Sequence, residues 1–430
     1  MVKKPGVYYG IWMVLAGFAL LFLYAGAGFY SFSIFIKPFE DTFGWSRAAI
    51  SFAMSIYLML HGVCAPLVGY LTEKYGPKPV MTGFAALTGA AFILVSFTNS
   101  LLYFYFAYAV LSVGTVGIGW IPISSILARW FIRRRGTAIG FTMVGISAGG
   151  FFISPLVGEL NVVFSWRVSY VVMGLLVWLI AVPVTLLVVK GSPAEMGLRP
   201  DGDPWDEAAQ PEGRPTGEAS VKTAEEEGWP FRPALRTRAF WWVATAFLLA
   251  PMAQMGILQH QVPLVTEAGL SPAVAATAMG ITAGMGGLGK LSFGRISESL
   301  DFRYVAALCF GCQSLAVFLL LFIKSVTLVW VYVFLFGFGM GGVVVLLPVV
   351  VGQYFGLVAF GTLMGTITFM QSIGSSAGAV ISGLIYDHFG NYTYAMILFG
   401  SMNLVAIAAT CMAGRPIPYR PAEADDPAGR

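Results

Sequence analysis

The sequence predicts an all-α membrane protein with twelve transmembrane helices arranged as two pseudo-symmetric six-helix bundles. Three observations predict this fold class. Of the 430 residues, 57% are hydrophobic and only 11% are charged, and the mean hydropathy is +0.78, whereas a soluble domain carries about 25% charged residues. Twelve apolar segments have the length of about 20 residues that a membrane-spanning helix needs. Sequence motifs of the first half also recur in the second half at one fixed offset.

The first six apolar segments precede a long polar stretch. They are approximately 10–36, 48–72, 79–97, 101–128, 137–160 and 166–189. Each is expected to be helical, because lipid offers no hydrogen-bond partner to an unpaired backbone group. Prolines inside these segments are tolerated and mark bends. They are Pro66, Pro122, Pro155 and Pro183.

The remaining six segments follow the polar stretch. They are approximately 238–266, 272–297, 303–323, 327–353, 359–386 and 392–413. Pro263 and Pro348 lie inside two of them. The same reasoning predicts helices here, with short loops between consecutive spans.

The distribution of cationic residues predicts the orientation in the membrane. Twenty Lys and Arg residues fall on the side of the two termini, and four fall on the opposite side, namely Lys37, Arg47, Arg167 and Lys324. Because cytoplasmic loops carry the excess of Lys and Arg, both termini are expected to be cytoplasmic. The short tail before residue 10 has no small-residue cleavage site, so the first segment is expected to remain as an anchor.

A polar stretch divides the chain. Residues 190–237 are rich in Pro, Gly, Glu and Asp, a composition typical of a partly disordered linker. We therefore expect a first bundle over 1–189, a cytoplasmic linker over 190–237, a second bundle over 238–414 and a cytoplasmic tail over 415–430.

The two halves repeat each other at an offset of 225 residues. GYLTEKYGPKPV (69–80) corresponds to GRISESLDFRYV (294–305), and GTAIG (136–140) corresponds to GTLMG (361–365). Two separate motifs with one offset are difficult to obtain by chance. Parallel six-helix repeats are typical of transporters, which place the substrate near the membrane midplane between the halves.

Several other classes of function are disfavoured. The chain has no nucleophile–base motif, no HExxH, no P-loop lysine and no ATP-binding domain, and a net charge of +4 gives no nucleic-acid signal. The four cysteines lie in apolar stretches without a metal-binding or disulfide pattern, so we expect packing roles. We predict neither an enzyme nor a metal or cofactor site. Transport would then use gradients of ions or substrate.

Lys290 is the main candidate for binding a substrate. It is the only fully charged residue well inside a predicted span, and such a residue usually faces a cavity and has a function. A buried cation suits an anionic ligand. The alternative is that Lys290 extends its side chain to the cytoplasmic interface, about 10 Å away. Small neighbours such as Ala283, Gly287 and Gly294 favour close helix packing over lipid contact.

The loop motif Gly69–Lys78 (G-x-L-x-E-K-x-G-x-K) resembles the signature of the major facilitator superfamily. Within that superfamily, the chain resembles the monocarboxylate transporters and their bacterial relatives, including oxalate/formate exchangers. The stretches that carry this resemblance are YYGIW (8–12), YSFSIFIKPFEDTFGWSRAAIS (30–51), ARWFIRRRGTAIGFTMVGISAGG (128–150), SPAEMGLRPDG (192–202) and QYFGLVAFGTLMG (353–365).

The resemblance implies alternating-access transport of small carboxylates, often with a proton, and places the family's carboxylate-binding cation at Lys290. The family usually has arginine there, and lysine cannot form a bidentate fork. Gly286 stands where animal members carry an aspartate, and Tyr30 where they carry a lysine. The eleventh helix lacks the second cation of oxalate exchangers. One buried charge favours a monocarboxylate over a dicarboxylate.

Two histidines are further candidates. His260 lies near the outer end of the seventh helix, which lines the cavity in this family, and it could bind substrate or a proton. It could equally be a hydrogen-bonded structural residue. His61 lies near the middle of the second helix and could carry a proton or bond to a carbonyl. With Lys290, these two form our set of candidates for proton coupling.

Four polar-tipped residues could line the cavity and donate hydrogen bonds to a carboxylate. They are Tyr30, Trp120, Tyr332 and Gln371. Packing is the alternative role for each. The loop charges are expected to hold the two halves together in the outward-open state, as the resemblance implies, or to set topology and bind lipid headgroups. They are Glu73, Lys78, Arg133, Arg134, Arg135, Glu298 and Arg303.

These observations predict a monomeric secondary transporter for small monocarboxylates such as lactate or pyruvate, with proton symport. An organic-anion exchanger of the oxalate/formate type is the alternative. A carboxylate receptor is disfavoured because the linker is too short and too polar to be a soluble output domain, and a drug exporter because no acidic residue lies at mid-membrane. The partners expected are a small organic anion, protons and lipid. The short tails suggest a prokaryotic inner membrane.

Overall fold

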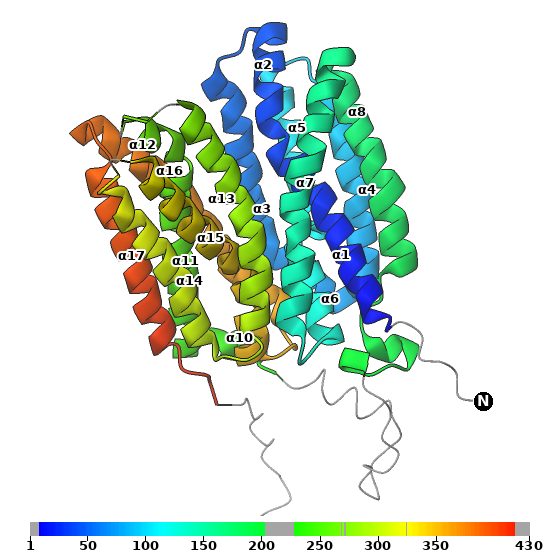
Figure 1. Ribbon diagram of the computed structural model, residues 1–430. Helices are drawn as coiled ribbons and strands as arrows, with labels where there is room; N and C mark the ends of the chain where they lie inside the picture. The colour runs from blue at the N-terminus through cyan, green and yellow to red at the C-terminus, as the bar shows by residue number, and fades with distance from the viewer. Residues whose placement is uncertain (1–7, 203–227, 268, 271, 324, 418–430) are drawn as a thin grey trace, which may run out of the picture.

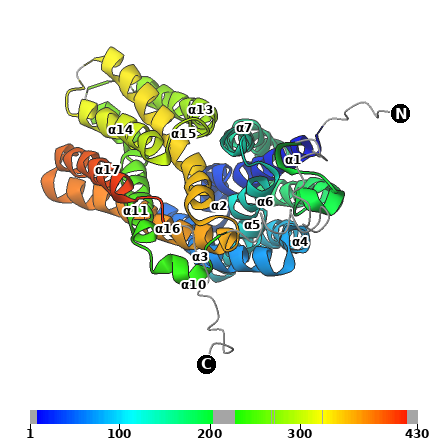
Figure 2. The same ribbon diagram turned by 90° about the horizontal axis from the view of Figure 1, so that it is seen from below.

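The computed structural model describes residues 8–202, 228–267, 269–270, 272–323 and 325–417. Its helices run side by side in two groups, as Figures 1 and 2 show. The helices of the first group are α1 (Gly10–Ala25), η1 (Gly26–Tyr30), α2 (Phe32–Phe43), α3 (Arg47–Tyr75), α4 (Pro77–Ser96), α5 (Leu101–Ile118), α6 (Trp120–Trp130), α7 (Arg135–Val163), α8 (Trp166–Leu176), η2 (Val177–Ala181) and η3 (Val184–Val188).

The second group follows the linker. It consists of α11 (Arg238–Leu258), α12 (Gln261–Glu267), α13 (Pro272–Ile296), α14 (Phe302–Leu320), α15 (Val326–Phe355), α16 (Phe360–Phe389) and α17 (Thr393–Met412). Short turns occupy the described parts of the linker, namely η4 (Pro193–Met196), η5 (Pro200–Gly202) and α10 (Phe231–Leu235). The central residues 203–227 of the predicted linker lie outside the described residues. We call the end of the molecule where α1 begins and α17 ends the terminal end, and the opposite end the far end (Figure 1).

Ten helical stretches of the described chain are long and apolar enough to cross a membrane. The other two long helices, α13 with 25 residues and α16 with 30 residues, complete the twelve predicted spans. These two helices pack against α7 and α3 across the boundary between the groups. The all-α, two-bundle fold class is therefore confirmed.

Four predicted spans are not single continuous α-helices. The first continues through a π-turn into α2 and ends at Phe43 rather than at residue 36. The fourth is broken at Gly119, whose extended backbone separates α5 from α6. The sixth passes from α8 through the π-helical segments η2 and η3, which lie on either side of Val182 and Pro183. The seventh is broken at Gln259 and His260, before Pro263. Proline therefore did not mark the break in either the fourth or the seventh span.

Hydroxyl side chains fix where several helices begin. Ser46, Ser100, Ser165 and Ser325 accept a hydrogen bond from a backbone N–H in the first turn of α3, α5, α8 and α15. Such caps satisfy amide groups that have no partner within the helix. These four helix starts lie at the far end (Figure 1). The capping serines therefore determine where the loops there end and the helices begin.

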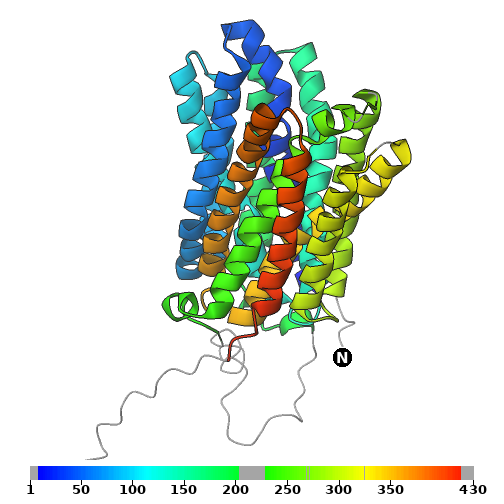
Figure 3. The same ribbon diagram turned by 90° about the vertical axis from the view of Figure 1, so that its left-hand side faces the viewer.

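Each half has its own apolar core, and another cluster joins the halves. In the first half, aromatic rings gather around Phe39, which contacts Phe104 and Trp166 with ring centroids 4.7 Å apart in both pairs. The joining cluster places Val68 of α3 with Leu363 and other residues of α16. Figure 3 shows α3 and α16 running side by side.

Glycines bring the halves into backbone contact at the terminal end. Gly69 of α3 lies against Gly361 of α16, and Gly294 of α13 lies against Gly136 of α7. A methyl group on Gly69, Gly136 or Gly294 would collide with the carbonyl of the opposing glycine. These two contacts are related by the 225-residue offset, so the sequence repeat corresponds to a structural pseudo-symmetry.

The helices α7 and α13 separate toward the far end. Along the face of α13 that carries Gly294 and Lys290, the next turns present Gly287, Gly284 and Gly280. A methyl group on any of these three would meet no atom within 4 Å. The helices α7 and α13 are therefore in backbone contact near the terminal end and diverge toward the far end, where these three glycines have free space beside them (Figure 1).

Candidate functional site

Lys290 lies at the point where α7 and α13 separate. Its backbone carbonyl packs against Gly140 of α7, where an added methyl group would lie 2.5 Å away. Its ammonium donates a hydrogen bond of 2.8 Å to the hydroxyl of Ser147 on the same helix. The residue is only 5% exposed. A charge from one half is therefore held by a hydroxyl from the other half.

The side chain of Lys290 extends toward the far end. Ser147 follows Gly140 by seven residues, which is about 10 Å along an α-helix, and α7 runs from the terminal end to the far end. The ammonium therefore points away from the terminal interface that the snorkelling alternative requires. It points toward the open face at Gly287.

A second polar cluster lies in the first half. The hydroxyl of Tyr24 on α1 and Nε2 of His61 on α3 are 3.1 Å apart, and their ring centroids are 5.7 Å apart. Tyr57, one turn from His61, donates a hydrogen bond of 2.8 Å to the hydroxyl of Thr115 on α5. His61 is thus bonded to a side chain, not to the carbonyl that the structural alternative assumed.

Tyr30 lies beside the same part of α7 as Lys290. Its ring is in contact with Gly150, one turn beyond Ser147, where an added methyl group would lie 2.7 Å from a ring carbon. The side chain is 36% exposed. The structure therefore places the Tyr30 ring against α7 one turn beyond Ser147, in the half opposite to Lys290.

Trp120 and Gln371 lie along the boundary between the halves. Trp120 begins α6 and packs against both the first core and the joining cluster. Its indole N–H and the Oε1 atom of Gln371 are buried without a hydrogen-bond partner in the described structure. Ser372, next to Gln371, packs against Gly62 of α3. The indole N–H can donate a hydrogen bond to a ligand, and the amide oxygen can accept one.

Tyr332 and His260 lie apart from this region. Tyr332 is fully buried in the core of the second half and stacks on Phe336, with centroids 5.3 Å apart. His260 is hydrogen-bonded through Nδ1 to the Tyr392 hydroxyl at 2.9 Å and through Nε2 to the Ala379 carbonyl at 3.2 Å. The structure does not bring either residue to Lys290.

Two glutamates connect the halves at the terminal end. Glu73 of α3 accepts hydrogen bonds from the backbone N–H and the hydroxyl of Thr362, in the first turn of α16. Glu298, just after α13, accepts one of 2.7 Å from the N–H of Thr137, in the first turn of α7. A carboxylate is stabilised at a helix N-terminus by unpaired N–H groups and the helix dipole. Each half therefore caps a helix of the other.

Arginines surround the second of these contacts. Arg295 pairs with Glu298 at 2.6 Å, and Arg135 donates to the carbonyls of Phe131 and Ala128 while lying against Gly352 of α15. A surface hollow of about 580 Å³ lies at this junction. It is lined by Arg133, Arg134, Arg295, Ile296, Glu298 and Ser299.

Among the described residues, the side chains of Lys78 and Arg303 form no hydrogen bond or ion pair with the opposite half. Arg303 donates to Asp301 at 3.1 Å, at the start of α14. Partial burial raises the pKa of the Asp301 carboxyl, but the hydrogen bonds and charge of Arg303 outweigh it and hold that pKa below its usual value. A gating role for Lys78 and Arg303 therefore stays a prediction.

The start of the linker is bound to the loop before α7. The carboxylate of Asp201 accepts hydrogen bonds of 2.9–3.3 Å from the backbone N–H groups of Ile132, Arg133 and Arg134. Asp201 has φ of +59°, the left-handed conformation that Asp and Asn adopt more readily than most residues. The linker thus holds the loop before α7, and Glu298 of the opposite half caps the first turn of that helix.

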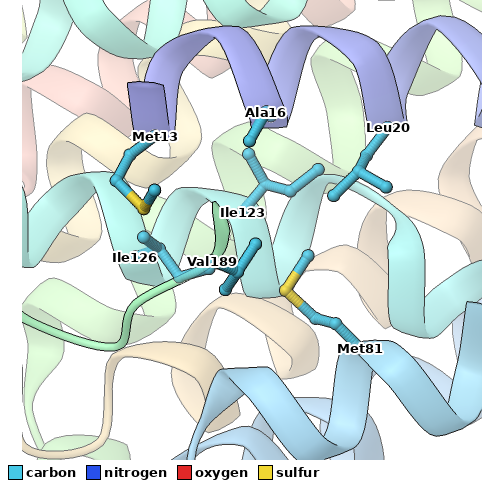
Figure 4. A pocket seen from close by; sticks show the side chains of 8 residues that line it. Met13, Ala16, Leu20, Met81, Ile123, Ile126 and Val189 are labelled. Atoms are coloured by element: carbon cyan, nitrogen blue, oxygen red, sulfur yellow. The ribbon is translucent and has the colours of Figure 1, made fainter. Parts of the chain in front are cut away.

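A small apolar cavity of about 10 Å³ lies within the first half. Figure 4 shows Met13, Ile123, Met81 and neighbouring aliphatic side chains around it. Its lining contains no charged or hydroxyl side chain, so it cannot bind a carboxylate. The described residues also contain no group of three His, Cys, Asp or Glu side chains that could hold a metal ion.

Sequence reasoning missed Ser147, Thr137, Thr362, Tyr24 and Asp201. The repeat could have found three of them, because the offset of 225 pairs Thr137 with Thr362 and Ser147 with Ser372. It would not have shown that the threonines contact Glu298 and Glu73. No local sequence signal indicated the contacts of Tyr24 and Asp201.

The sequence model of the Major Facilitator Superfamily matches residues 17–379, with a second match over residues 293–430. The chain therefore belongs to that superfamily. Monocarboxylate transporter 12 of Mus musculus is 26% identical over 406 residues, which cover 90% of this chain and 82% of the relative. Monocarboxylate transporter 13 of Rattus norvegicus is 24% identical over 382 residues, covering 87% and 82%. The resemblance to the monocarboxylate transporter branch is confirmed.

Solved structures establish the same fold. A single-residue variant of the E. coli fucose:proton symporter FucP superposes with a TM-score of 0.68 at 14% identity, covering 95% of this chain and all of that chain. The proton:xylose symporter XylE superposes with a TM-score of 0.66 at 14% identity, covering 94% and 95%. Relatives and structural neighbours are transporters, so this protein is a membrane transporter and not an enzyme.

Proposed function

We propose that this protein moves a small monocarboxylate across the membrane by alternating access, together with a proton, and that Lys290 holds the carboxylate. The observation that carries the proposal is the buried ammonium of Lys290, bonded to Ser147 of the opposite half where α7 and α13 separate. A carboxylate at this point would contact both halves at once. Binding could thus be linked to the relative movement of the halves.

The composition of the site supports a small anion with one carboxylate. Ser147 accepts a hydrogen bond from Lys290, so its own hydroxyl hydrogen is available to a carboxylate oxygen. Trp120, with its unpartnered N–H, lies along the same boundary, and the Tyr30 ring contacts α7 one turn beyond Ser147. The names of the relatives agree with this substrate class.

The cycle that we propose uses the glycine and glutamate contacts as its terminal gate. The anion enters from the open far end, Lys290 neutralises it, and the halves rock so that the terminal contacts separate. In the predicted orientation, the terminal end is cytoplasmic. The relatives named above are animal proteins, so the prokaryotic inner membrane remains a prediction.

Uptake into proteoliposomes tests the proposal. Labelled L-lactate and pyruvate would be offered with an inward proton gradient to the native protein and to Lys290→Met, which keeps the chain length without the charge. Lys74→Met, at the end of α3, is the matched control. We expect uptake in the native protein and the control, and its loss in Lys290→Met. Normal uptake by Lys290→Met would contradict the role of Lys290.

The alternative is exchange of organic anions without a net proton. Uptake that needs a counter-substrate inside the vesicles, and that persists when the proton gradient is collapsed, would favour it. Proton symport predicts the opposite result, with accumulation that disappears when the gradient is collapsed.

A further inference from the structure

We propose that His61 of α3 is the proton-binding group of this transporter and that Tyr24 of α1 positions its imidazole. The first half would then carry the proton, and Lys290 of the second half would hold the anion. This inference rests on the proposed function for its role in transport, but the binding of the proton can be tested without substrate.

The first support is the geometry of the pair. The Tyr24 hydroxyl is 3.1 Å from Nε2 of His61, and the centroid of the imidazole lies 5.7 Å from that of the Tyr24 ring and 6.1 Å from that of the Tyr57 ring. The hydroxyl of Tyr57 is engaged with Thr115 instead. Tyr24 is thus the single hydrogen-bond partner of His61 among the described residues.

The second support is the free ring nitrogen. Nδ1 of His61 makes no hydrogen bond with the described residues, whereas both nitrogens of His260 are bonded within the second half. When Nε2–H donates to the Tyr24 oxygen, Nδ1 presents its lone pair. A hydronium ion can transfer a proton there, forming the Nδ1–H bond of an imidazolium and leaving water. Transfer back to water on the other side releases the proton.

The third support is the position of His61 in the fold. The repeat offset of 225 pairs His61 with Gly286, which lies one turn from Lys290. His61 therefore corresponds to a position one helical turn, about 6 Å, farther from the terminal end than the backbone of Lys290. Gly62, next to His61, packs against Ser372 of α16. Rocking of the halves would therefore change what surrounds the imidazole.

The surroundings of His61 contain no countercharge among the described residues. The titratable groups near it are the hydroxyls of Tyr24 on α1, Tyr30 on η1 and Tyr57 on its own helix. On the other neighbouring helices, α5 contributes the hydroxyl of Thr115 and α16 that of Ser372. An imidazolium is therefore stabilised by the Tyr24 oxygen, through a charge-assisted hydrogen bond that is stronger than the neutral one.

The chain offers a direct measurement, because it contains only three histidines. Protein labelled with ¹⁵N-histidine in lipid nanodiscs would be titrated by NMR, and the His61 signal would be assigned by its absence in His61→Gln. In Tyr24→Phe, we expect the titration midpoint of His61 to fall by about 0.7–1 pH unit, a fivefold to tenfold loss of proton affinity. Tyr57→Phe is the matched control and should move it much less.

Transport gives the second readout. In His61→Gln, proton-driven accumulation of labelled L-lactate should be lost while lactate counterflow, which needs no net proton, persists. In Tyr24→Phe, the pH profile of uptake should move to lower pH with little change in the KM for lactate. Accumulation in His61→Gln equal to that of the native protein would overturn the inference, and so would equal shifts in Tyr24→Phe and Tyr57→Phe.

The two proposals fail in different ways. If the native protein does not transport lactate or pyruvate, the proposed substrate class is wrong, while the NMR titration still reports on His61. If His61→Gln also loses counterflow, Tyr24→Phe is the deciding variant. A shift of its pH profile and titration midpoint to lower pH, larger than in Tyr57→Phe, would support the inference, and equal shifts in the two variants would overturn it. A native His61 signal that does not titrate would overturn the inference by itself.

Discussion

Glu73 of α3 caps the first turn of α16 by accepting the backbone N–H of Thr362 at 2.8 Å. The same relationship recurs 225 residues later, where Glu298 accepts the N–H of Thr137 in the first turn of α7 at 2.7 Å. The two halves thus exchange helix caps across the terminal end. In the proposed cycle, a contact of this kind would exist only while that end is closed and would stabilise that one state.

Replacing both glutamates by glutamine should open the terminal end. Glu73→Gln together with Glu298→Gln weakens two charge-assisted hydrogen bonds, each by about 1–2 kcal/mol, so the closed state should lose tenfold or more in population. Spin labels at the exposed Ile132 and Leu300, with the four native cysteines removed, would report the distance between the halves. Unchanged distance distributions would show that the glycine contacts alone hold the end closed.

A methyl group at the seam should block closure. Gly136→Ala places a Cβ atom against the carbonyl of Gly294, a backbone group that cannot move aside cheaply. We expect uptake to fall by tenfold or more while the protein stays folded. Gly158→Ala on the same helix is the control, because nothing lies within 4 Å of its added methyl group. Equal activity in both variants would contradict the tight packing of α7 on α13.

Removal of the Ser147 hydroxyl should weaken anion binding. Ser147→Ala removes one donor to the carboxylate and one acceptor for the ammonium of Lys290. The loss of one hydrogen bond costs about 1 kcal/mol, so we expect the KM for the transported anion to rise about fivefold to tenfold. Ser147→Thr keeps the hydroxyl and should lie near the native value. Initial rates of uptake over a range of substrate concentrations measure both. A lower KM in Ser147→Ala would mean that Ser147 competes with the anion for Lys290.

Asp201 should matter for stability although it lies in the linker. Asp201→Ala leaves the N–H groups of Ile132, Arg133 and Arg134 without their acceptor and replaces a residue suited to positive φ, so we expect a loss of about 1–3 kcal/mol. Asp201→Asn tolerates the backbone conformation and keeps one acceptor, so its loss should be smaller. Thermal unfolding in detergent compares the two. A Tm of Asp201→Ala equal to that of the native protein would show that the linker contact is dispensable.

Only part of the candidate site could be predicted from the sequence. The sequence identified Lys290 and His61 because charged and titratable residues are costly inside a membrane and stand out in apolar segments. It could not show that Lys290 extends toward the far end, nor that Ser147 and Tyr24 are the bonding partners. Tyr332 was selected by its position in a helix, but a helical position does not reveal which face the neighbouring helices cover.

The sequence by itself determined the number of spans, the two halves and their offset, because hydrophobic length and repeated motifs are properties of the chain alone. It also contains the glycines and glutamates that connect the halves at the terminal end. Only the tertiary structure decided that these motifs meet crosswise, Glu73 with Thr362 and Glu298 with Thr137. The physical reason is that a repeat establishes which residues are equivalent, whereas contact across the halves depends on how closely two backbones approach.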